Sequence, residues 1–136
     1  MLRGMSTVTY FADDVAEARA WYASFLGVDA YFERKMPDGT LGYAEFRIGD
    51  HQAELGIVDR RFEVSPSAGP AGAVLYWAVD DLEGTFARLQ ELGAQVHDEP
   101  RPRGEGFVTA SVVDPFGNVL GIMTNAHYLS MVEQTS

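Results

Sequence analysis

Two glutamates in one predicted hairpin have the types and spacing needed for acid–base chemistry. Glu45 and Glu54 lie in apolar runs separated by Gly49-Asp50, and a two-residue turn with glycine first would place them directly opposite each other. Cross-strand partners share a face, and two carboxylates that close disfavour double ionisation, so one pKa should rise. A carboxyl group with a raised pKa can act as a general acid or base. The alternative is that these charges only keep an exposed strand soluble.

The same pairing predicts one apolar and one polar face for this hairpin. Ala44, Phe46, Ala53 and Leu55 would share the apolar face and pack on a helix. We predict Glu54 as the candidate catalytic residue. The polar face then supplies four candidate ligand-binding residues, Tyr43, Glu45, Arg47 and Gln52.

The elements that must position these residues follow the order β-α-β-β-β, and this order occurs twice. The first copy has a strand at 7–11, a helix with Asp14 as N-cap and Gly27 at its end, and strands at 30–34, 41–48 and 52–58. Residues 59–72 carry prolines and glycines and are predicted as a linker. The second copy has a strand at 73–79, a helix between Asp81 and Gly93, a short strand at 95–97, and strands at 107–113 and 119–124.

Turn chemistry marks the loops of the second copy. Asp114-Pro115-Phe116-Gly117-Asn118 combines a fixed φ, a glycine and two side chains that can bond the local backbone, which is typical of a tight loop between antiparallel strands. Residues 101–106 are predicted as a Pro/Gly loop, within which Gly104-Glu105-Gly106 could act as a lid.

Side-chain alternation extends the candidate site to the other strands. Strand residues that point away from the helices would line the space between two sheets, giving a mostly apolar, aromatic pocket of the kind that binds small molecules. This adds four predicted ligand-binding residues, Thr9, Phe11, Tyr76 and Met123. Simple core filling is the alternative for the apolar ones.

Composition narrows the classes of partner. The 136 residues carry a formal net charge of −10 and no basic run longer than Arg34-Lys35 or Arg60-Arg61, which argues against nucleic acid or an anionic membrane as partner. Without cysteine, thiolate metal sites and cysteine nucleophiles are excluded. No apolar run reaches membrane-spanning length and residues 1–7 lack the apolar core of a signal peptide, so we expect a cytoplasmic protein with a small-molecule ligand.

The paired modules, the Trp21-Tyr22 helix that ends in Leu26-Gly27, and the 114–118 loop resemble the vicinal oxygen chelate superfamily, which includes glyoxalase I, extradiol dioxygenases and bleomycin-binding proteins. The resemblance covers residues 5–125. It implies an α+β fold in a single glyoxalase-like domain over 5–127, with module one at 6–58, a linker at 59–72, module two at 73–125, and a C-terminal tail at 128–136.

The resemblance also indicates where a metal would bind. Metal-dependent members use side chains on the first and last strand of each module, positions that carry over to Thr7, Glu54, Val74 and Gly121. Only Glu54 could hold a divalent metal firmly. We therefore expect no metal and no other cofactor.

Three functions stay open at this point. The leading expectation is metal-free binding of a small apolar or aromatic organic molecule. The alternative is a metal-dependent lyase, isomerase or dioxygenase that uses Glu54, and the third is an interaction domain whose cavity is filled by side chains. We also expect a homodimer formed through sheet edges or helix faces, since open sheets leave unpaired edges.

Overall fold

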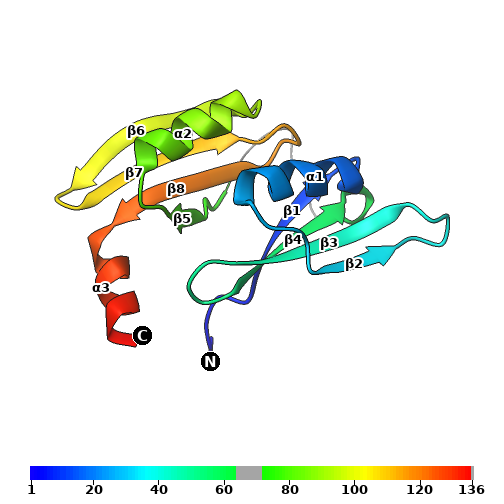
Figure 1. Cartoon of the computed structure of the whole chain (residues 1–136), viewed down its shortest axis with the longest axis horizontal. Coiled ribbons are helices and arrows are strands. Elements are labelled where there is room, and N and C mark those ends of the chain that lie inside the picture. Colours follow the sequence, from blue (N-terminus) through cyan, green and yellow to red (C-terminus); the bar gives the residue numbers. More distant parts are fainter. Residues whose placement is uncertain (64–71, 136) are drawn as a thin grey trace. The chain divides into compact units, whose positions relative to one another are not determined.

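The computed structural model describes residues 1–63 and 72–135 and divides into two compact units, Met1–Pro66 and Ser67–Ser136. Each unit is a four-stranded mixed sheet with a helix packed on one face, as the βαβββ repeat predicts (Figure 1). The predicted α+β fold is thereby confirmed.

The first unit has its strands in the order β1-β4-β3-β2. β1 runs parallel to β4, and the other pairs are antiparallel. A short 3-10 helix, η1, follows β4. The bounds are β1 Thr7–Ala12, α1 Val15–Leu26, β2 Phe32–Lys35, β3 Leu41–Ile48, β4 Ala53–Asp59 and η1 Arg60–Phe62.

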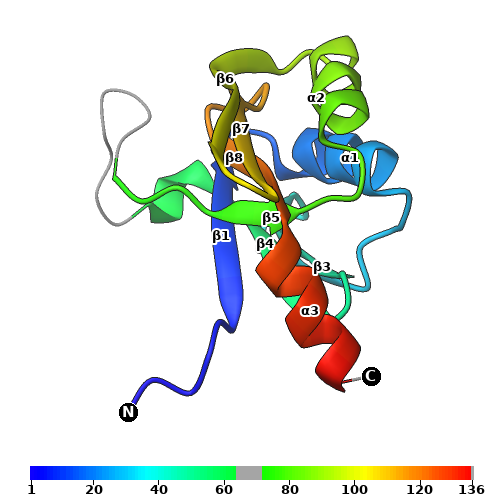
Figure 2. The ribbon, with the colours of Figure 1, turned by 90° about the vertical axis from the view of Figure 1, so that its left-hand side faces the viewer.

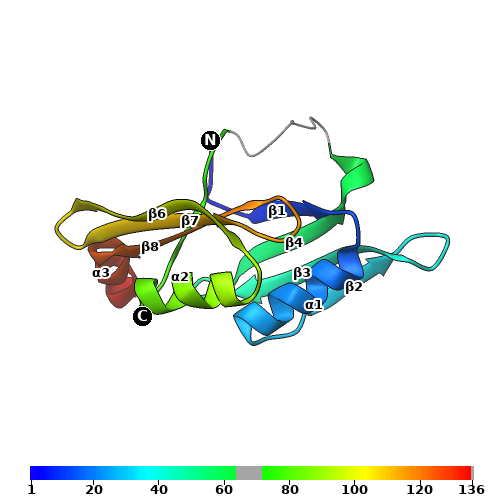
Figure 3. The same cartoon turned by 90° about the horizontal axis from the view of Figure 1, so that it is seen from above.

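Capping residues set the ends of α1. The Asp14 side chain accepts a hydrogen bond from the Glu17 backbone N–H at 3.1 Å, and Gly27 ends the helix in the left-handed conformation with φ 74°. Both features were predicted. Val15, Ala18 and Tyr22 are the buried face of α1, which lies along the sheet of its unit (Figure 3).

The core of the first unit lies between α1 and one face of the sheet. Strand residues on that face are almost fully buried: Tyr10, Ala12, Ala44, Phe46, Leu55 and Ile57. Since side chains alternate along a strand, the residues between them must lie on the opposite face, which α1 does not cover.

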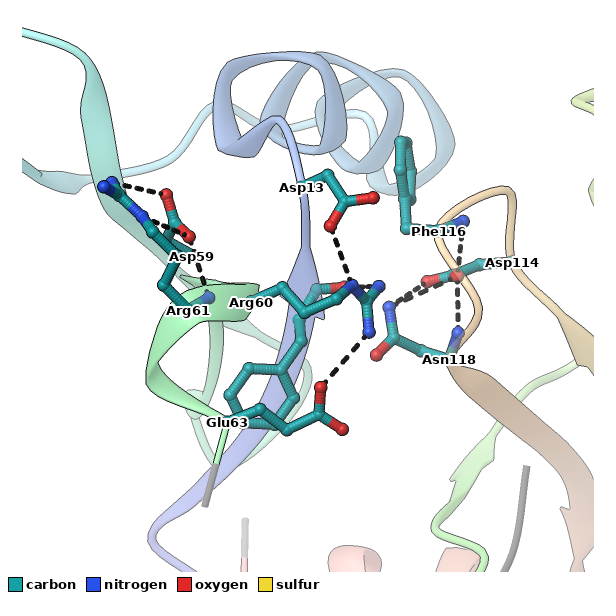
Figure 4. A network of polar contacts seen from close by, with 9 residues as sticks. Asp13, Asp59, Arg60, Arg61, Glu63, Asp114, Phe116 and Asn118 are labelled. Carbon is teal, nitrogen blue, oxygen red and sulfur yellow. Dashed lines mark hydrogen bonds and ion pairs between the residues drawn. The ribbon is translucent and has the colours of Figure 1, made fainter. Parts of the chain in front are cut away.

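An arginine ties the end of β1 to the chain after β4. Arg60 Nη2 donates to the Phe11 carbonyl at 3.3 Å, while Nε and Nη1 contact the Asp13 and Glu63 carboxylates at 3.0 and 3.4 Å (Figure 4). Beside it, Asp59 accepts two hydrogen bonds from the Arg61 guanidinium. These contacts fix where β1 and β4 end and therefore hold their alignment.

The second unit repeats the arrangement with the strand order β5-β8-β7-β6. Asp81 caps its first helix by accepting from Gly84 N–H at 3.0 Å, and Leu82, Phe86 and Leu89 are the buried stripe of that helix. The bounds are β5 Tyr76–Ala78, α2 Leu82–Glu91, β6 Gln95–Gly104, β7 Phe107–Val113, β8 Val119–Asn125 and α3 Ala126–Thr135.

The loop that joins β7 to β8 is organised by one buried carboxylate. Asp114 Oδ1 accepts hydrogen bonds from the backbone N–H groups of Phe116 and Asn118 at 2.9 and 2.8 Å, and its carboxylate also binds the Asn118 side chain (Figure 4). Gly117 takes φ 93°. The predicted tight loop is confirmed.

Three predictions for the second unit are wrong. The strand expected at 95–97 extends to Gly104, and the loop and lid expected at 101–106 are reduced to a turn at Glu105-Gly106. The prolines that suggested a loop are tolerated because β6 is an edge strand, where half of the backbone N–H groups need no partner in the sheet. β5 is shorter than the predicted 73–79, so Val74 precedes it.

The segments after each sheet also differ from expectation. The predicted tail is largely helical: α3 begins directly after β8 (Figure 2). Asn125 caps this helix, since its side-chain oxygen accepts a hydrogen bond from the Tyr128 backbone N–H at 2.9 Å. The predicted linker begins as the end of β4 and η1, while its residues 64–71 lie outside the described part of the chain. Within the described ranges, no helix is long and apolar enough to cross a membrane.

Candidate functional site

The β3–β4 hairpin has a longer turn than predicted. Ile48 pairs with Ala53, so the turn comprises residues 49–52, and Gly49 and Gln52 both take positive φ, 78° and 53°. Gln52 closes the turn by donating its backbone N–H to the Gly49 carbonyl at 3.2 Å. Predicted as a ligand-binding residue on the strand, Gln52 lies instead in the turn.

The observed pairing moves each partner by two residues, but every side chain within β3 and β4 stays on its predicted face. Glu45 lies opposite Gly56, and Glu54 lies opposite Arg47. The predicted direct Glu45–Glu54 pairing is therefore wrong, because it assumed a two-residue turn. The prediction that Tyr43, Glu45, Arg47 and Glu54 share one face of the sheet is confirmed.

These four side chains form a polar group on that face. The Tyr43 hydroxyl donates a hydrogen bond to the Glu45 carboxylate. Arg47 Nη1 lies 3.8 Å from Glu54 Oε2 and 3.3 Å from the Gln52 carbonyl, which it binds as a donor. Glu45 is buried, whereas the side chain of Arg47 remains 44% exposed. The group therefore runs from a buried carboxylate to a solvent-accessible cation.

Burial and like charge act together on Glu45. Desolvation first, and then the neighbouring Glu54 carboxylate, raise the pKa of Glu45, while the Arg47 guanidinium lowers it. Burial and Glu54 also raise the pKa of Tyr43, so its hydroxyl stays a donor at neutral pH. A carboxyl that keeps its proton more readily than usual can exchange that proton with a bound molecule.

Exposed aromatic rings flank the polar group. The Phe32 ring lies edge-on to Tyr43 at 6.1 Å between centroids, and the Arg47 guanidinium lies over the Tyr31 ring at 5.2 Å. Tyr31 and Phe32 are 52% and 40% exposed. The sequence analysis did not single out either residue, although Phe32 and Arg34 alternate on an edge strand next to the polar face.

A glycine makes room for Tyr43. A Cβ atom on Gly56 would lie 2.7 Å from the Tyr43 hydroxyl, so the ring lies directly over this backbone position. Gly121 in the second unit has the same relation to the Tyr76 ring, with 2.8 Å to Cδ1. The sequence repeat Leu-Gly-Ile thus corresponds to a repeated structural feature, an aromatic ring over a strand glycine.

The remaining predicted site residues lie on the expected faces of their own sheets. Thr9 pairs with Gly56 and Phe11 with Val58, which places both on the face of Glu54. In the second unit, Tyr76 pairs with Gly121 and Met123 with Ala78, on the face opposite the core that packs on α2. Their placement is confirmed, and their role in binding stays a prediction.

A second polar group, which the sequence analysis missed, lies on the face of the second sheet that carries Tyr76 and Met123. Ser111 and Thr109, both buried, contact His97 Nδ1 at 2.8 Å and Arg103 Nε at 3.0 Å. Asp98 Oδ1 accepts from Arg101 at 2.6 Å. Hydroxyls at alternate positions of a buried strand are the available signal, but the part of the partner strand that carries Arg101 and Arg103 is predicted as a loop.

The residues at the family-implied metal positions do not fit a divalent metal. Thr7 pairs with Glu54 in the first sheet, but Val74 and Gly121 offer no side-chain donor. Among the described residues, no three His, Cys, Asp or Glu side chains are grouped so that they could hold a metal ion. The Glu54 carboxylate is instead paired with Arg47.

Comparison with known families agrees with this architecture. The model of the Glyoxalase/Bleomycin resistance protein/Dioxygenase superfamily matches residues 4–122. The chain belongs to this superfamily. No curated protein sequence matches it.

Solved structures of the same fold are numerous but distant in sequence. A glyoxalase/bleomycin resistance protein from Streptomyces sp. CB03234 is 24% identical with a TM-score of 0.64, over 88% of this chain and 98% of that one. A superfamily member from Sphaerobacter thermophilus is 17% identical with a TM-score of 0.69, over 90% and 97%. A glyoxalase-related enzyme from Fulvimarina pelagi is 17% identical with a TM-score of 0.68, over 91% and 89%. At such identities the likeness shows the fold.

Proposed function

We propose that this superfamily member binds a small apolar or aromatic organic molecule without a metal ion. The binding surface is the sheet face of the first unit that α1 leaves uncovered. One observation carries the proposal: the polar group of Tyr43, Glu45, Glu54 and Arg47 lies beside the exposed ring of Phe32. A few fixed polar groups next to aromatic surface are the usual make-up of a small-molecule site.

The chemistry of the group indicates what it would recognise. Rings at Phe32 and Tyr43 offer stacking or edge contacts to an aromatic ligand, and Thr9 and Phe11 lie on the same sheet face, on β1 next to β4. The Glu54 side chain can accept a hydrogen bond from a ligand N–H or O–H, and the exposed Arg47 can donate one. Such a ligand has an apolar ring system with a polar hydrogen-bond donor.

A binding experiment with a matched pair of probes tests this proposal. Indole carries an N–H donor and 1-methylindole lacks it, so a two-dimensional NMR titration with each compound separates hydrogen bonding from ring contact. We expect indole to shift amide signals of β3 and β4. Glu54→Gln should weaken indole binding roughly tenfold, the loss expected for one hydrogen bond to a charged group. It should leave 1-methylindole binding nearly unchanged.

Glu91→Gln on α2 is the control, because it removes an equal charge from an exposed position of the other unit. Signals on β3 and β4 that do not respond to either probe would contradict the proposal. An equal loss of indole affinity in Glu54→Gln and Glu91→Gln would also contradict the proposal.

Metal analysis of the purified protein separates this function from the alternative, a metal-dependent lyase, isomerase or dioxygenase using Glu54. We expect far less than one equivalent of zinc, nickel, iron or manganese per chain, because Thr7, Val74 and Gly121 provide no strong donors. About one equivalent, lost in Glu54→Gln, would favour the metalloenzyme.

A further inference from the structure

The second polar group brings two arginines onto one face of an otherwise acidic chain. Arg101 and Arg103 come from the edge strand β6, and their side chains are 57% and 50% exposed. Both contact a single carboxylate, Asp98, at 2.6 and 3.6 Å. Two guanidinium charges against one carboxylate leave one positive charge in excess, in a chain whose formal net charge is −10.

Buried hydroxyls of the neighbouring strand hold this group in place. Arg103 donates Nε–H to Thr109 Oγ1 at 3.0 Å, and Thr109 is 7% exposed. His97 contacts Ser111, which is 1% exposed, at 2.8 Å. The pairing Arg101–Thr109 and Asp98–Ser111 places the group on the sheet face opposite α2. A guanidinium bonded through Nε retains the four N–H groups of its two Nη atoms.

Donor capacity remains after these contacts. A guanidinium has five N–H groups. Arg103 uses Nε and directs Nη2 toward Asp98, and Arg101 uses Nη2. The other N–H groups of the two side chains have no hydrogen-bond partner among residues 1–63 and 72–135. Paired donors of this geometry match the two oxygens of a carboxylate.

The same face also carries apolar surface. Thr109 pairs with Met123, which pairs with Ala78 on the far strand, next to the exposed ring of Tyr76. The face therefore runs from the two arginine side chains of β6 to an apolar edge at β5. We infer that this face of the second unit is an anion-binding site for an organic carboxylate whose apolar part lies toward Met123 and Tyr76.

Matched probes that differ only in charge test the inference. 3-Phenylpropionate and 3-phenylpropionamide have nearly the same shape, and NMR titrations can follow both through the arginine Nε–H signals and the amides of β6, β7 and β8. We expect the carboxylate to bind several-fold more tightly than the amide and to shift Arg101 and Arg103. Arg101→Gln and Arg103→Gln should each remove this preference, and Thr109→Val should reduce it by freeing Arg103.

Arg88→Gln is the matched control, since it removes the same charge from the last turn of α2. It should leave the preference for the carboxylate intact. Equal affinity of both probes would overturn the inference, as would a preference that survives in Arg103→Gln with a native amide spectrum. The site lies in the second unit, so these outcomes are independent of indole binding at β3 and β4.

Discussion

On the first sheet, two side chains of the same type have different surroundings, which give them different hydrogen-bond and ion-pair partners. Glu45 and Glu54 are both glutamates, yet Glu45 is buried under a tyrosine hydroxyl while Glu54 faces an exposed arginine. Desolvation and the neighbouring Glu54 carboxylate therefore raise the pKa of Glu45. A carboxyl group with a raised pKa is suited to donate its proton to a bound molecule.

Replacing Glu54 by glutamine should lower the pKa of Glu45. Glu54 raises that pKa by its carboxyl–carboxyl hydrogen bond and by its like charge, so a neutral amide of equal size removes both contributions and leaves desolvation as the main cause. NMR titration of the carboxyl carbons of both proteins measures the shift directly. Identical Glu45 titration in the two proteins would show that the carboxylates do not interact.

The same group should leave a signature in stability. The pKa of Glu45 is raised in the folded state, so its contribution is fully present below the ordinary value of 4.5 and is lost as the pH rises through the folded-state pKa. Urea unfolding across this interval should therefore show a steeper decline with pH in the wild type than in Glu45→Gln. Parallel curves would mean that the pKa of Glu45 is unchanged by folding.

Strand glycines under aromatic rings give a prediction at the scale of elements. Gly56→Ala would place Cβ against the movable Tyr43 ring, whereas Gly121→Ala would also meet the Leu75 backbone carbonyl at 2.5 Å. Overpacking lowers the free energy of unfolding by about 1–3 kcal/mol. We expect the loss for Gly121→Ala to lie near or above the upper end of this range and the loss for Gly56→Ala near its lower end. Thermal unfolding measures both, and Gly56→Ala should in addition disturb the Tyr43–Glu45 hydrogen bond.

The loop between β7 and β8 depends on Asp114. Replacement by alanine removes the buried carboxylate that accepts from the N–H groups of Phe116 and Asn118 in a half-buried loop, which should cost about 1–3 kcal/mol. Asp114→Asn keeps one oxygen acceptor and should cost clearly less. Chemical denaturation of the two variants gives the comparison, and equal losses would assign the effect to charge.

Local signals predicted most elements but not their partners. Capping aspartates and terminal glycines defined α1 and α2, because these contacts are made within a few residues. The strand at 95–97 was predicted, but its continuation to Gly104 was missed, since proline disfavours strands except at an edge and edge position depends on the whole sheet. The group around Arg103 and Thr109 was missed with it. The exact pairing of β3 with β4 depended on a positive φ at Gln52, a conformation uncommon for a residue other than glycine.

At the scale of the whole molecule, the edge strands limit how two copies could associate. Pro100 and Pro102 interrupt β6, so this edge offers few backbone donors to another chain. β2 carries Glu33, Arg34 and Lys35, all exposed, which also discourages pairing. The apolar side chains Leu129 and Met131 on α3 are 49% and 45% exposed.

We therefore expect the predicted homodimer to use a helix face in preference to β2 or β6. Leu129→Lys combined with Met131→Lys should convert a dimer to a monomer if α3 contributes. Light scattering at micromolar concentration measures the mass. Glu91→Lys on α2 is the control, because it changes the formal net charge by the same amount as the double substitution. A monomeric wild type would contradict the dimer itself.

The four-residue turn of residues 49–52 has a consequence for how the sequence excludes a competing alignment. Sliding β4 by two residues past β3 keeps every apolar side chain on the same face, so the apolar pattern alone does not distinguish the two hairpins. Charge does: the competing alignment sets Glu45 against Glu54, whereas the native one sets Arg47 against Glu54. The pair of glutamates thereby encodes alignment as well as a candidate site, and acid, by neutralising both, would erase that discrimination while leaving the apolar pattern intact.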